Sequence, residues 1–288
     1  MIQQFEEQPD LLPGISAYVP CFNNEDTVEE SIHSLLNQTI KPDKVFAVDD
    51  GSTDKTRERV SAAGVEVLCN GRNFGRGYTR ARAIEQVSHE YVVCCDATNV
   101  LAPDFLEKTL PYFNDPKVAS ISGHLRSSNA SGFVGRWRSR HLFKENVTPG
   151  PPIPTAMLIT YGTLMRTSPI LQVGNFNQSL MHTEDNELGL RLVSAGYKIL
   201  GSPDAVVRSI ALPKLWNTLE RYWRWYVGVD EKVSIGNYLH TIKASFRPMA
   251  QQDVASGDWA AAMISLLCPH YCLWKTLSRK LAGKTNRQ

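Results

Sequence analysis

The chain has 288 residues, of which 42% are hydrophobic and 21% charged, and its formal net charge is +2. This length suits one large α/β domain or two small ones, and the composition is that of a soluble globular protein. The small net charge creates no overall positive field, so we expect no nucleic-acid partner. The six cysteines lack metal-ligand spacing, which favours a reducing compartment.

Residues 1–14 read as a polar, acidic lead-in. They lack the basic and apolar regions of a signal peptide, so we expect a cytoplasmic protein. An alternation of strands and helices follows, with strands at 15–19, 45–48 and 65–68 and helices at 25–37 and 53–63. This β-α-β-α-β order predicts right-handed crossovers and a parallel sheet.

Two predicted strands run directly into carboxylates. Residues 45–48 precede Asp49 and Asp50, and residues 91–95 precede Asp96. Short apolar runs bounded by turn residues are typical of strands buried on both faces, and ligands bind beyond the carboxyl ends of such strands. We therefore expect these acids to converge on one crevice, where they could hold a divalent cation or ribose hydroxyls. The alternative for the Asp49–Asp50 pair is a turn that caps the next helix.

A stretch rich in glycine and arginine, residues 70–77, precedes a helix predicted at 78–87. Arginines around a helix N-terminus favour an anion, although a solvated basic helix face would have the same composition. Further on, helices are predicted at 104–113 and 168–173 and strands at 118–123, 197–201 and 205–209, with a long irregular segment at 126–154. Such a long loop is usually functional or mobile. Residues 156–165 are predicted as one strand or as two short strands around Gly162.

An acidic segment, Thr183-Glu184-Asp185-Asn186-Glu187, begins a predicted helix that ends before Gly196. Capping and the helix dipole would account for one or two of these acids. Because the segment follows two acid-tipped strands, we favour a functional role for it.

The C-terminal third differs in character. Residues 215–229 are rich in aromatic residues and arginine, and residues 259–274 are mainly apolar. The apolar run is shorter than the roughly 20 residues needed to span a bilayer. Basic residues follow it, at Lys275, Arg279, Lys280, Lys284 and Arg287. This pattern predicts peripheral contact of 259–288 with an anionic membrane surface, and the alternative is a helix packed on the domain.

Taken together, four segments resemble, in the right order, the motifs of the family two glycosyltransferases. They are 19–25, 48–54, 73–75 with Arg80, and 174–177 with 183–191. The resemblance implies a GT-A fold over 15–210, with a Rossmann-like, mostly parallel central sheet flanked by helices. A helical extension would occupy 211–288.

The resemblance also implies an activity: inverting transfer of a single sugar from a nucleotide-diphosphate sugar to a hydroxyl of a glycan or lipid-linked acceptor. The setting would be cell-envelope polysaccharide biosynthesis, at the inner face of the plasma membrane. Asp185 would be the catalytic base, with Glu184 beside it. The nucleotide-sugar-binding residues would be Pro20, Phe22, Glu25, Asp49, Asp50, Arg80, Asp96, Ala97 and Thr98.

One motif departs from the family pattern. The usual Asp-X-Asp reads Asp96-Ala97-Thr98 here, so its second acid is missing. A divalent cation (Mn²⁺ or Mg²⁺) prefers carboxylate oxygens and could still bind through Asp96, diphosphate oxygens and a distal His240. The alternatives are metal-free transfer, with the charge carried by Arg80 and Arg126, and an inactive relative that only binds the donor.

Residues 221–225, Arg-Tyr-Trp-Arg-Trp, resemble the Gln-X-X-Arg-Trp motif of processive polysaccharide synthases. The first residue differs and the membrane spans of those synthases are lacking, so we expect one sugar per cycle. The aromatic residues could stack on sugars or a lipid-linked acceptor, or cover the sheet as an amphipathic helix. A nucleotidyltransferase or a dinucleotide oxidoreductase would need a glycine-rich signature after the first strand, where residues 20–23 read Pro-Cys-Phe-Asn.

Overall fold

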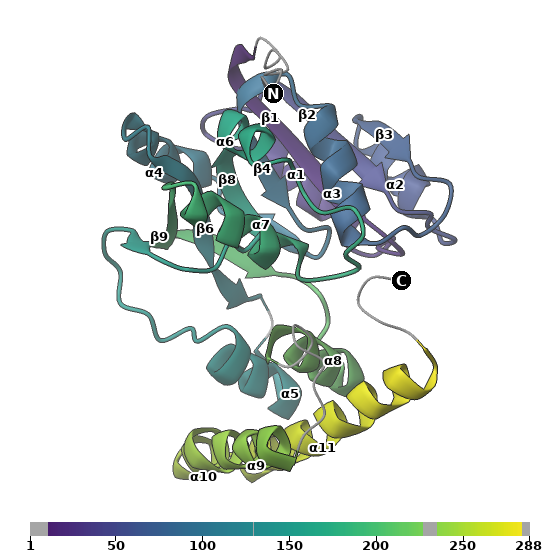
Figure 1. Cartoon of the computed structure of the whole chain (residues 1–288), viewed down its shortest axis with the longest axis vertical. Coiled ribbons are helices and arrows are strands. Elements are labelled where there is room, and N and C mark those ends of the chain that lie inside the picture. The colour runs from purple at the N-terminus through teal and green to yellow at the C-terminus, as the bar shows by residue number, and fades with distance from the viewer. Residues whose placement is uncertain (1–10, 129, 227–234, 284–288) are drawn as a thin grey trace, which may run out of the picture.

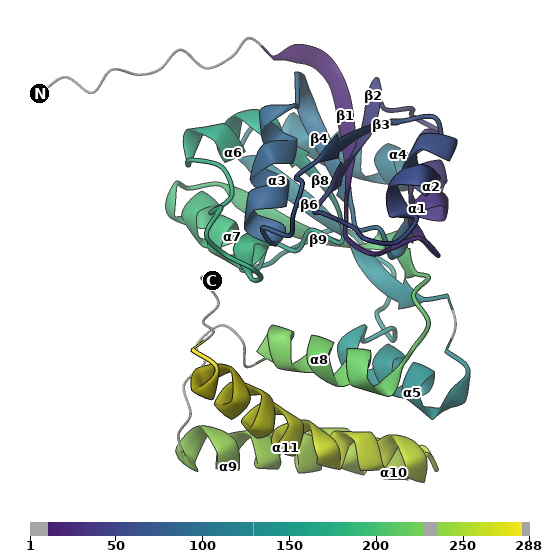
Figure 2. The same ribbon diagram turned by 90° about the vertical axis from the view of Figure 1, so that its right-hand side faces the viewer.

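A computed structural model describes residues 11–128, 130–226 and 235–283 (Figure 1). Figure 2 shows a sheet with helices on both faces and a separate group of helices below it. The strands of the sheet lie in the order β3-β2-β1-β4-β8-β6-β9-β5, and β7 pairs with β9. The predicted α/β architecture with flanking helices and a helical C-terminal region is confirmed.

The first four strands form the parallel half of the sheet. They are β1 (Leu12–Cys21), β2 (Lys44–Asp49), β3 (Glu66–Cys69) and β4 (His89–Cys95). β1 pairs in parallel with both β2 and β4, and β2 pairs in parallel with β3. The connecting helices are α1 (Val28–Leu36), α2 (Thr56–Ala62) and α3 (Arg76–Glu85). The β-α-β-α-β order predicted from the apolar runs is therefore present, and β1 begins three residues before the predicted strand.

Alternation along β1 shows how the two faces are buried. Ala17 and Val19 belong to the hydrophobic cluster under α1 and α2, whereas Tyr18 belongs to the cluster under α3. All three side chains are fully buried. A central strand covered on both faces in this way is apolar at most positions, which is why its sequence shows a nearly continuous run.

The second half of the sheet is mixed. β8 (Gly162–Arg166) lies antiparallel to β4 and to β6 (Val118–Ser127), and β6 pairs in parallel with β9 (Lys198–Ser209). Two short strands, β5 (Asn99–Leu101) and β7 (Ile153–Pro154), lie antiparallel to β9. The sheet is thus parallel only in part. The two strands expected at 197–201 and 205–209 are one strand with an irregular register.

The strand predicted at 156–165 is largely wrong, because only its end belongs to β8. The carbonyl group of Ile159 accepts hydrogen bonds from the side chains of Ser122 and Thr163. The carbonyl group of Tyr161 accepts one from the Asn99 side chain. These polar groups are satisfied outside a strand ladder, so the segment needs no regular structure.

Short helices complete the upper part of the molecule. The helix predicted at 104–113 is divided into α4 (Phe105–Thr109) and a 3₁₀ turn, η1 (Leu110–Asn114), with a proline near the start of that turn. The α6 helix (Thr167–Gln172) and α7 (Glu184–Ser194) lie on the same face of the sheet as α3 (Figure 2).

The lower helices come from two parts of the chain. The segment 126–154, predicted to be irregular, contains α5 (Gly132–Trp137) and the π-helical turn η2 (Arg138–Leu142). The C-terminal region adds α8 (Leu215–Tyr226), α9 (Ile235–Ala244), η3 (Ser245–Ala250), α10 (Gln251–Ala255) and α11 (Trp259–Leu281). In Figure 2, α5 and α8 lie nearest the sheet, and α9, α10 and α11 lie beneath them.

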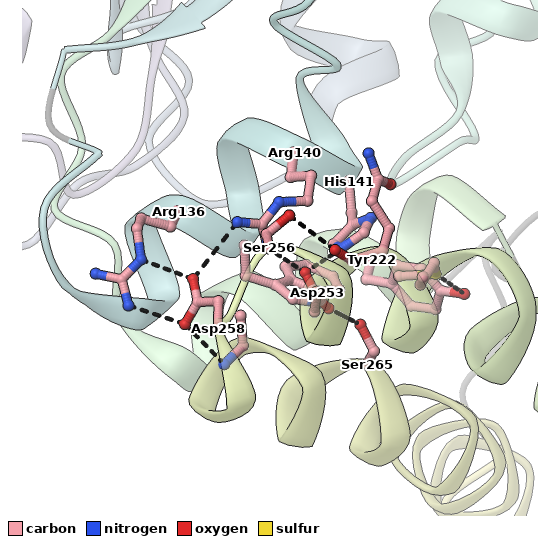
Figure 3. Close-up of polar contacts among 12 residues, drawn as sticks. Arg136, Arg140, His141, Tyr222, Asp253, Ser256, Asp258 and Ser265 are labelled. Atoms are coloured by element: carbon pink, nitrogen blue, oxygen red, sulfur yellow. Dashed lines mark hydrogen bonds and ion pairs between the residues drawn. The ribbon is translucent and has the colours of Figure 1, made fainter.

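Two buried aspartates hold α10 and α11 against α5 and η2 (Figure 3). Arg136 donates two hydrogen bonds to Asp258, at 2.6 and 2.9 Å. Arg140 forms an ion pair with Asp253, and His141 Nε2 lies 2.7 Å from the same carboxylate. We call this group the Asp253–Asp258 clamp. It joins the C-terminal helices to a segment that lies more than a hundred residues earlier in the chain.

Candidate active site

Asp49 closes the turn at the end of β2. Its buried carboxylate accepts hydrogen bonds from the backbone N–H of Ser52, at 3.1 and 3.3 Å, and lies 3.9 Å from Arg57 Nε. Gly51 adopts φ +81°, and a Cβ atom there would lie 2.5 Å from the backbone of Arg72. The structure therefore gives Asp49 the turn-forming role that the sequence left open as an alternative.

Asp50 orders the glycine-rich loop. Its carboxylate accepts hydrogen bonds from Asn70 Nδ2 at 2.9 Å, from the Phe74 N–H at 3.0 Å and from the Gly75 N–H at 2.9 Å. These contacts fix the loop that leads into α3. Asp50 thus places the N-terminus of α3 beside the carboxyl ends of the strands.

A cavity of about 320 Å³ opens at the carboxyl ends of β1, β2 and β4, and we call it the strand-end cavity. Seven of the predicted nucleotide-sugar-binding residues line it: Pro20, Phe22, Asp50, Arg80, Asp96, Ala97 and Thr98. Two do not. Asp49 is buried in its turn, and Glu25 is exposed and accepts a hydrogen bond from the backbone N–H of Lys55 at 3.0 Å.

Arg80 joins the end of β4 to the start of α7. Its NH2 atom lies 2.7 Å from Asp96 Oδ1, its Nε atom lies 2.9 Å from Glu184 Oε1, and its NH1 atom donates to Cys94 Sγ at 2.7 Å. The guanidinium group is almost fully buried. Although burial alone would raise the pKa of Asp96, Arg80 lowers it below its usual value. Arg80 thus holds two carboxylates, and each nitrogen of its guanidinium group donates to a neighbour.

The predicted catalytic pair lies at the start of α7. Asp185 accepts a hydrogen bond from the Thr160 hydroxyl at 3.2 Å. It lines a cavity of about 50 Å³, the Asp185 cavity, which shares Arg80 and Asp96 with the strand-end cavity. Glu184 is buried beside it, and its pKa is raised by burial and by the Asp185 charge. The two cavities adjoin each other, and we call them together the cleft. It reaches from the strand ends to Asp185.

Three further arginines line this cleft: Arg76, which belongs to the stretch predicted to favour an anion, and Arg221 and Arg224, which were not predicted as site residues. Arg76, at the start of α3, and Arg224, on α8, line the strand-end cavity, the Asp185 cavity and a third cavity of about 260 Å³ beside α8. Arg221 lines the last two. Burial and the neighbouring arginines lower the pKa of Arg221 to about 9, and burial and Arg76 lower that of Arg224 to about 10. The Arg-X-X-Arg-Trp resemblance was the signal that could have identified the α8 arginines.

The sequence pattern of glycosyl transferase family 2 matches residues 16–174, which is more than half of the chain. The chain belongs to glycosyl transferase family 2. The predicted family and the GT-A-like fold are thereby confirmed.

Relatives of this family two chain include curated synthases. The poly-β-1,6-N-acetyl-D-glucosamine synthase of Staphylococcus aureus strain MSSA476 is 25% identical over 255 residues, which cover 83% of this chain and 60% of that protein. The synthase of the same name from Staphylococcus epidermidis is 25% identical over 273 residues, covering 88% and 64%. The chain therefore spans somewhat less than two thirds of the length of these relatives.

Solved structures share the fold of this family two protein. The mannosyltransferase PcManGT from Pyrobaculum calidifontis, in complex with GDP-Man and Mn²⁺, has a TM-score of 0.58 and 16% identity, covering 96% of this chain and 79% of that one. S. aureus TarS 1–349, in complex with UDP-GlcNAc, has a TM-score of 0.55 and 17% identity, covering 94% and 92%.

Two residues that were predicted to bind a metal or carry charge lie outside the cleft of this family two protein. His240 is exposed on α9, which Figure 2 places in the lowest layer, so the structure does not bring it to Asp96. Arg126 lies on β6 and lines none of the three cavities. Within the described ranges, no group of three or more histidine, cysteine or acidic residues is placed to hold a metal ion.

Proposed function

We propose that this family two protein is an inverting glycosyltransferase that moves one sugar from a nucleotide-diphosphate sugar to an acceptor hydroxyl. The observation that carries the proposal is the continuity of the cleft. Asp185 lies at one end, Asp50 lies in the strand-end cavity at the other, and Asp96 lines both cavities. Acids from three elements thus face one space large enough to receive a substrate.

In this proposal the nucleotide lies in the strand-end cavity, near Pro20, Phe22 and Asp50. The acceptor hydroxyl oxygen attacks the anomeric carbon from the Asp185 side. The bond from that carbon to the diphosphate oxygen breaks, its electron pair leaves with the nucleoside diphosphate, and the hydroxyl proton passes to the Asp185 carboxylate. Positive charge near the diphosphate stabilises the developing negative charge.

The buried neighbours of Asp185 fit positioning roles. The Thr160 hydroxyl donates to Asp185 Oδ2, which orients the carboxylate toward the cleft. Glu184 lines none of the three cavities and accepts a hydrogen bond from Arg80. We therefore propose that Asp185 accepts the proton and that Glu184 holds Arg80 in position.

Replacing Asp185 with asparagine tests the proposal. Turnover should fall at least 100-fold, since a positioned general base contributes about 10²- to 10⁴-fold, while nucleotide binding should change little. Nucleoside diphosphate release from a panel that includes UDP-GlcNAc and GDP-Man measures turnover, and calorimetry measures binding. Glu187→Gln is the matched control, because Glu187 lies in the same helical turn but pairs with Arg191. Full turnover in Asp185→Asn would contradict the assignment.

A second candidate function is a catalytically inactive nucleotide-sugar binder. The incomplete Asp-X-Asp motif, Asp96-Ala97-Thr98, favours it. Such a protein would bind a donor from the panel without releasing nucleoside diphosphate at any acceptor concentration. The same measurements on the wild-type protein therefore separate the two functions.

We further propose that the acceptor is a glycan or a lipid-linked intermediate, and that α11 lies against the cytoplasmic face of a membrane. Its exposed apolar residues recur at helical spacing: Trp259, Met263, Leu266, Leu267, Trp274 and Leu277. The opposite face, with Ala261 and Ile264, packs in the core. Within the described parts of the chain, no helix has the length and hydropathy needed to cross a bilayer.

Sedimentation with vesicles tests the membrane contact. Wild-type protein should sediment with vesicles that contain anionic lipid, and replacing Trp259 and Trp274 with serine should reduce the bound fraction several-fold. If the double variant binds vesicles as well as the wild type does, α11 is not the membrane contact. The bound fraction on neutral vesicles, compared with that on anionic vesicles, measures how much the basic residues contribute to membrane binding.

A further inference from the structure

The residues near Asp96 do not fit the divalent cation that the family motif implies. A divalent cation such as Mg²⁺ takes about six oxygen ligands, and beside substrate phosphates it still needs one or two carboxylates from the protein. Here Asp96 is the acid of the motif, and its Oδ1 atom already accepts a hydrogen bond from Arg80 at 2.7 Å. Thr98 stands where the second acid of the motif would be.

The charge around Asp96 also opposes a cation. Arg76, Asp96 and Arg224 all line the same three cavities, so the two arginines lie with Asp96 at the junction of these cavities. Arg221 lines two of them. Within the described residues, none of these three arginines forms an ion pair with a carboxylate. Carboxylates such as Asp96 and Glu220 act on these charges only without direct pairing, so the three arginines still oppose a further cation in the cleft.

An anion would relieve this repulsion. Burial and mutual repulsion lower the pKa of Arg221 and of Arg224, so the unliganded protein holds these charges at a cost. A guanidinium group binds phosphate oxygens through two parallel hydrogen bonds. A diphosphate offers several such oxygens and gains negative charge as it leaves the sugar.

We infer that Arg76, Arg221 and Arg224 bind the donor diphosphate in the place of a divalent cation, so that donor binding and transfer do not require a metal. The inference rests on the proposed function and deepens it. Two of the three arginines come from α8, which follows the matched family segment. The C-terminal helical region is therefore a part of the donor site.

Calorimetric titration with UDP and GDP, in EDTA and in Mn²⁺, tests the inference, with UMP and GMP as matched ligands that lack the second phosphate. The wild-type protein should bind one of the diphosphates in EDTA at least tenfold more tightly than its monophosphate, and Mn²⁺ should change the affinity less than threefold. Arg76→Gln and Arg224→Gln should each weaken diphosphate binding by about 10- to 100-fold, as expected for lost hydrogen bonds to a charged group. Monophosphate affinity should be nearly unchanged.

Two controls keep the result interpretable. Arg59→Gln removes an exposed arginine of α2 that pairs with Glu29 and lines none of the three cavities, so it should bind like the wild type. Arg224→Lys keeps a charge but loses the two-pronged contact, so its affinity should lie between those of Arg224→Gln and the wild type. Retention of the melting temperature shows that each variant is folded.

The outcomes separate the two proposals. Diphosphate binding that disappears in EDTA and returns with Mn²⁺ would overturn the metal-free inference and leave the proposed function standing. Unchanged affinity in both glutamine variants would also overturn it. Failure of every nucleotide and nucleotide sugar to bind in either buffer would contradict the proposed function, and the inference with it.

Discussion

Arg80 stabilises two carboxylates at once, and its removal should cost more than the loss of an ordinary arginine. Arg80→Gln would leave Glu184 buried without its cation and Asp96 without its ion pair. Breaking a buried ion pair in this way costs about 3–5 kcal/mol, and the partial exposure of Asp96 places the expected loss near the lower end. Urea unfolding of Arg80→Gln measures it.

The control for this variant is Arg82→Gln on the same helix. Arg82 donates to the Cys69 carbonyl group and to Asn70 Oδ1 from a half-buried position, and it pairs with no carboxylate among the described residues. Its replacement should lower the free energy of unfolding by about 1–2 kcal/mol, less than the replacement of Arg80. Equal losses in the two variants would show that the Arg80 pairs contribute no special stability.

His182 should make the fold sensitive to acid. Burial and the nearby Arg279, Arg224 and Arg76 lower its pKa to about 4, below the ordinary 6.5 of an unfolded chain. Between these values the unfolded chain binds a proton that the folded protein does not, so the associated stability is full above pH 6.5 and is lost as the pH falls toward 4. The loss at pH 5 should be on the order of 2 kcal/mol.

Urea unfolding at pH 7 and pH 5 measures this effect in the wild type and in His182→Gln. The variant should lose distinctly less stability between the two pH values. The pKa of Asp258 is lowered to about 2, so its contribution changes only below about pH 4 and lies outside the window. Identical pH dependence in the two proteins would contradict the assignment to His182.

At the scale of elements, the Asp253–Asp258 clamp should hold the C-terminal helices in place. The Asp253 carboxylate is fully buried and accepts hydrogen bonds from Arg140, His141 and Ser265. Asp253→Asn would leave the Arg140 charge without its main partner and should destabilise the protein by about 2–4 kcal/mol. It should also speed proteolysis within residues 250–260.

Asp115→Asn is the control for Asp253→Asn. Asp115 forms an ion pair with Lys198, and both side chains are largely exposed. Because exposed pairs contribute about 0–1 kcal/mol, its removal should be almost neutral. A clamp variant as stable and as protease-resistant as Asp115→Asn would show that α10 and α11 are held by apolar packing alone.

The elements differ in how far the sequence could predict them. The strands β1, β2 and β4 are buried on both faces, so their apolar runs identify them directly. The helix α5 and the turn η2 show no such pattern. They are stabilised by distant partners, as when Trp137 packs in the core and donates to Ser265 of α11. The antiparallel direction of β8 likewise depends on its neighbours β4 and β6 rather than on local residues.

The residues of the site also divide into those marked by a local sequence pattern and those placed by tertiary packing. Asp96 and Asp185 were predicted because each follows a local pattern that the family shares. The sequence could not separate the turn role of Asp49 from ligand binding, because either role suits an acid at the end of a strand. Arg224 was missed as a cleft residue because α8 reaches the cleft only through its tertiary packing, with Leu219 and Trp223 in the core.

At the scale of the whole molecule, the cleft lies between the sheet with its flanking helices and the lower group of helices. The strand ends and the start of α3 supply Asp50, Asp96 and Arg76, whereas α8 supplies Arg221 and Arg224. Figure 2 shows α8 below the sheet, in the upper layer of the lower helices. A ligand that contacts both sides would therefore join the sheet to the helices.

Hydrogen exchange should reveal this joining. A nucleoside diphosphate that binds in EDTA should slow amide exchange in the loop at 70–75 and in α8, because arginines on α8 contact its second phosphate. The matching monophosphate should protect the loop but leave α8 nearly unchanged, and α9, in the lowest layer, should be unaffected by both ligands. Mass spectrometry of peptides that cover 70–85, 215–226 and 235–244 measures the three regions. Protection of the loop without α8 by the diphosphate would show that the C-terminal helices take no part in donor binding.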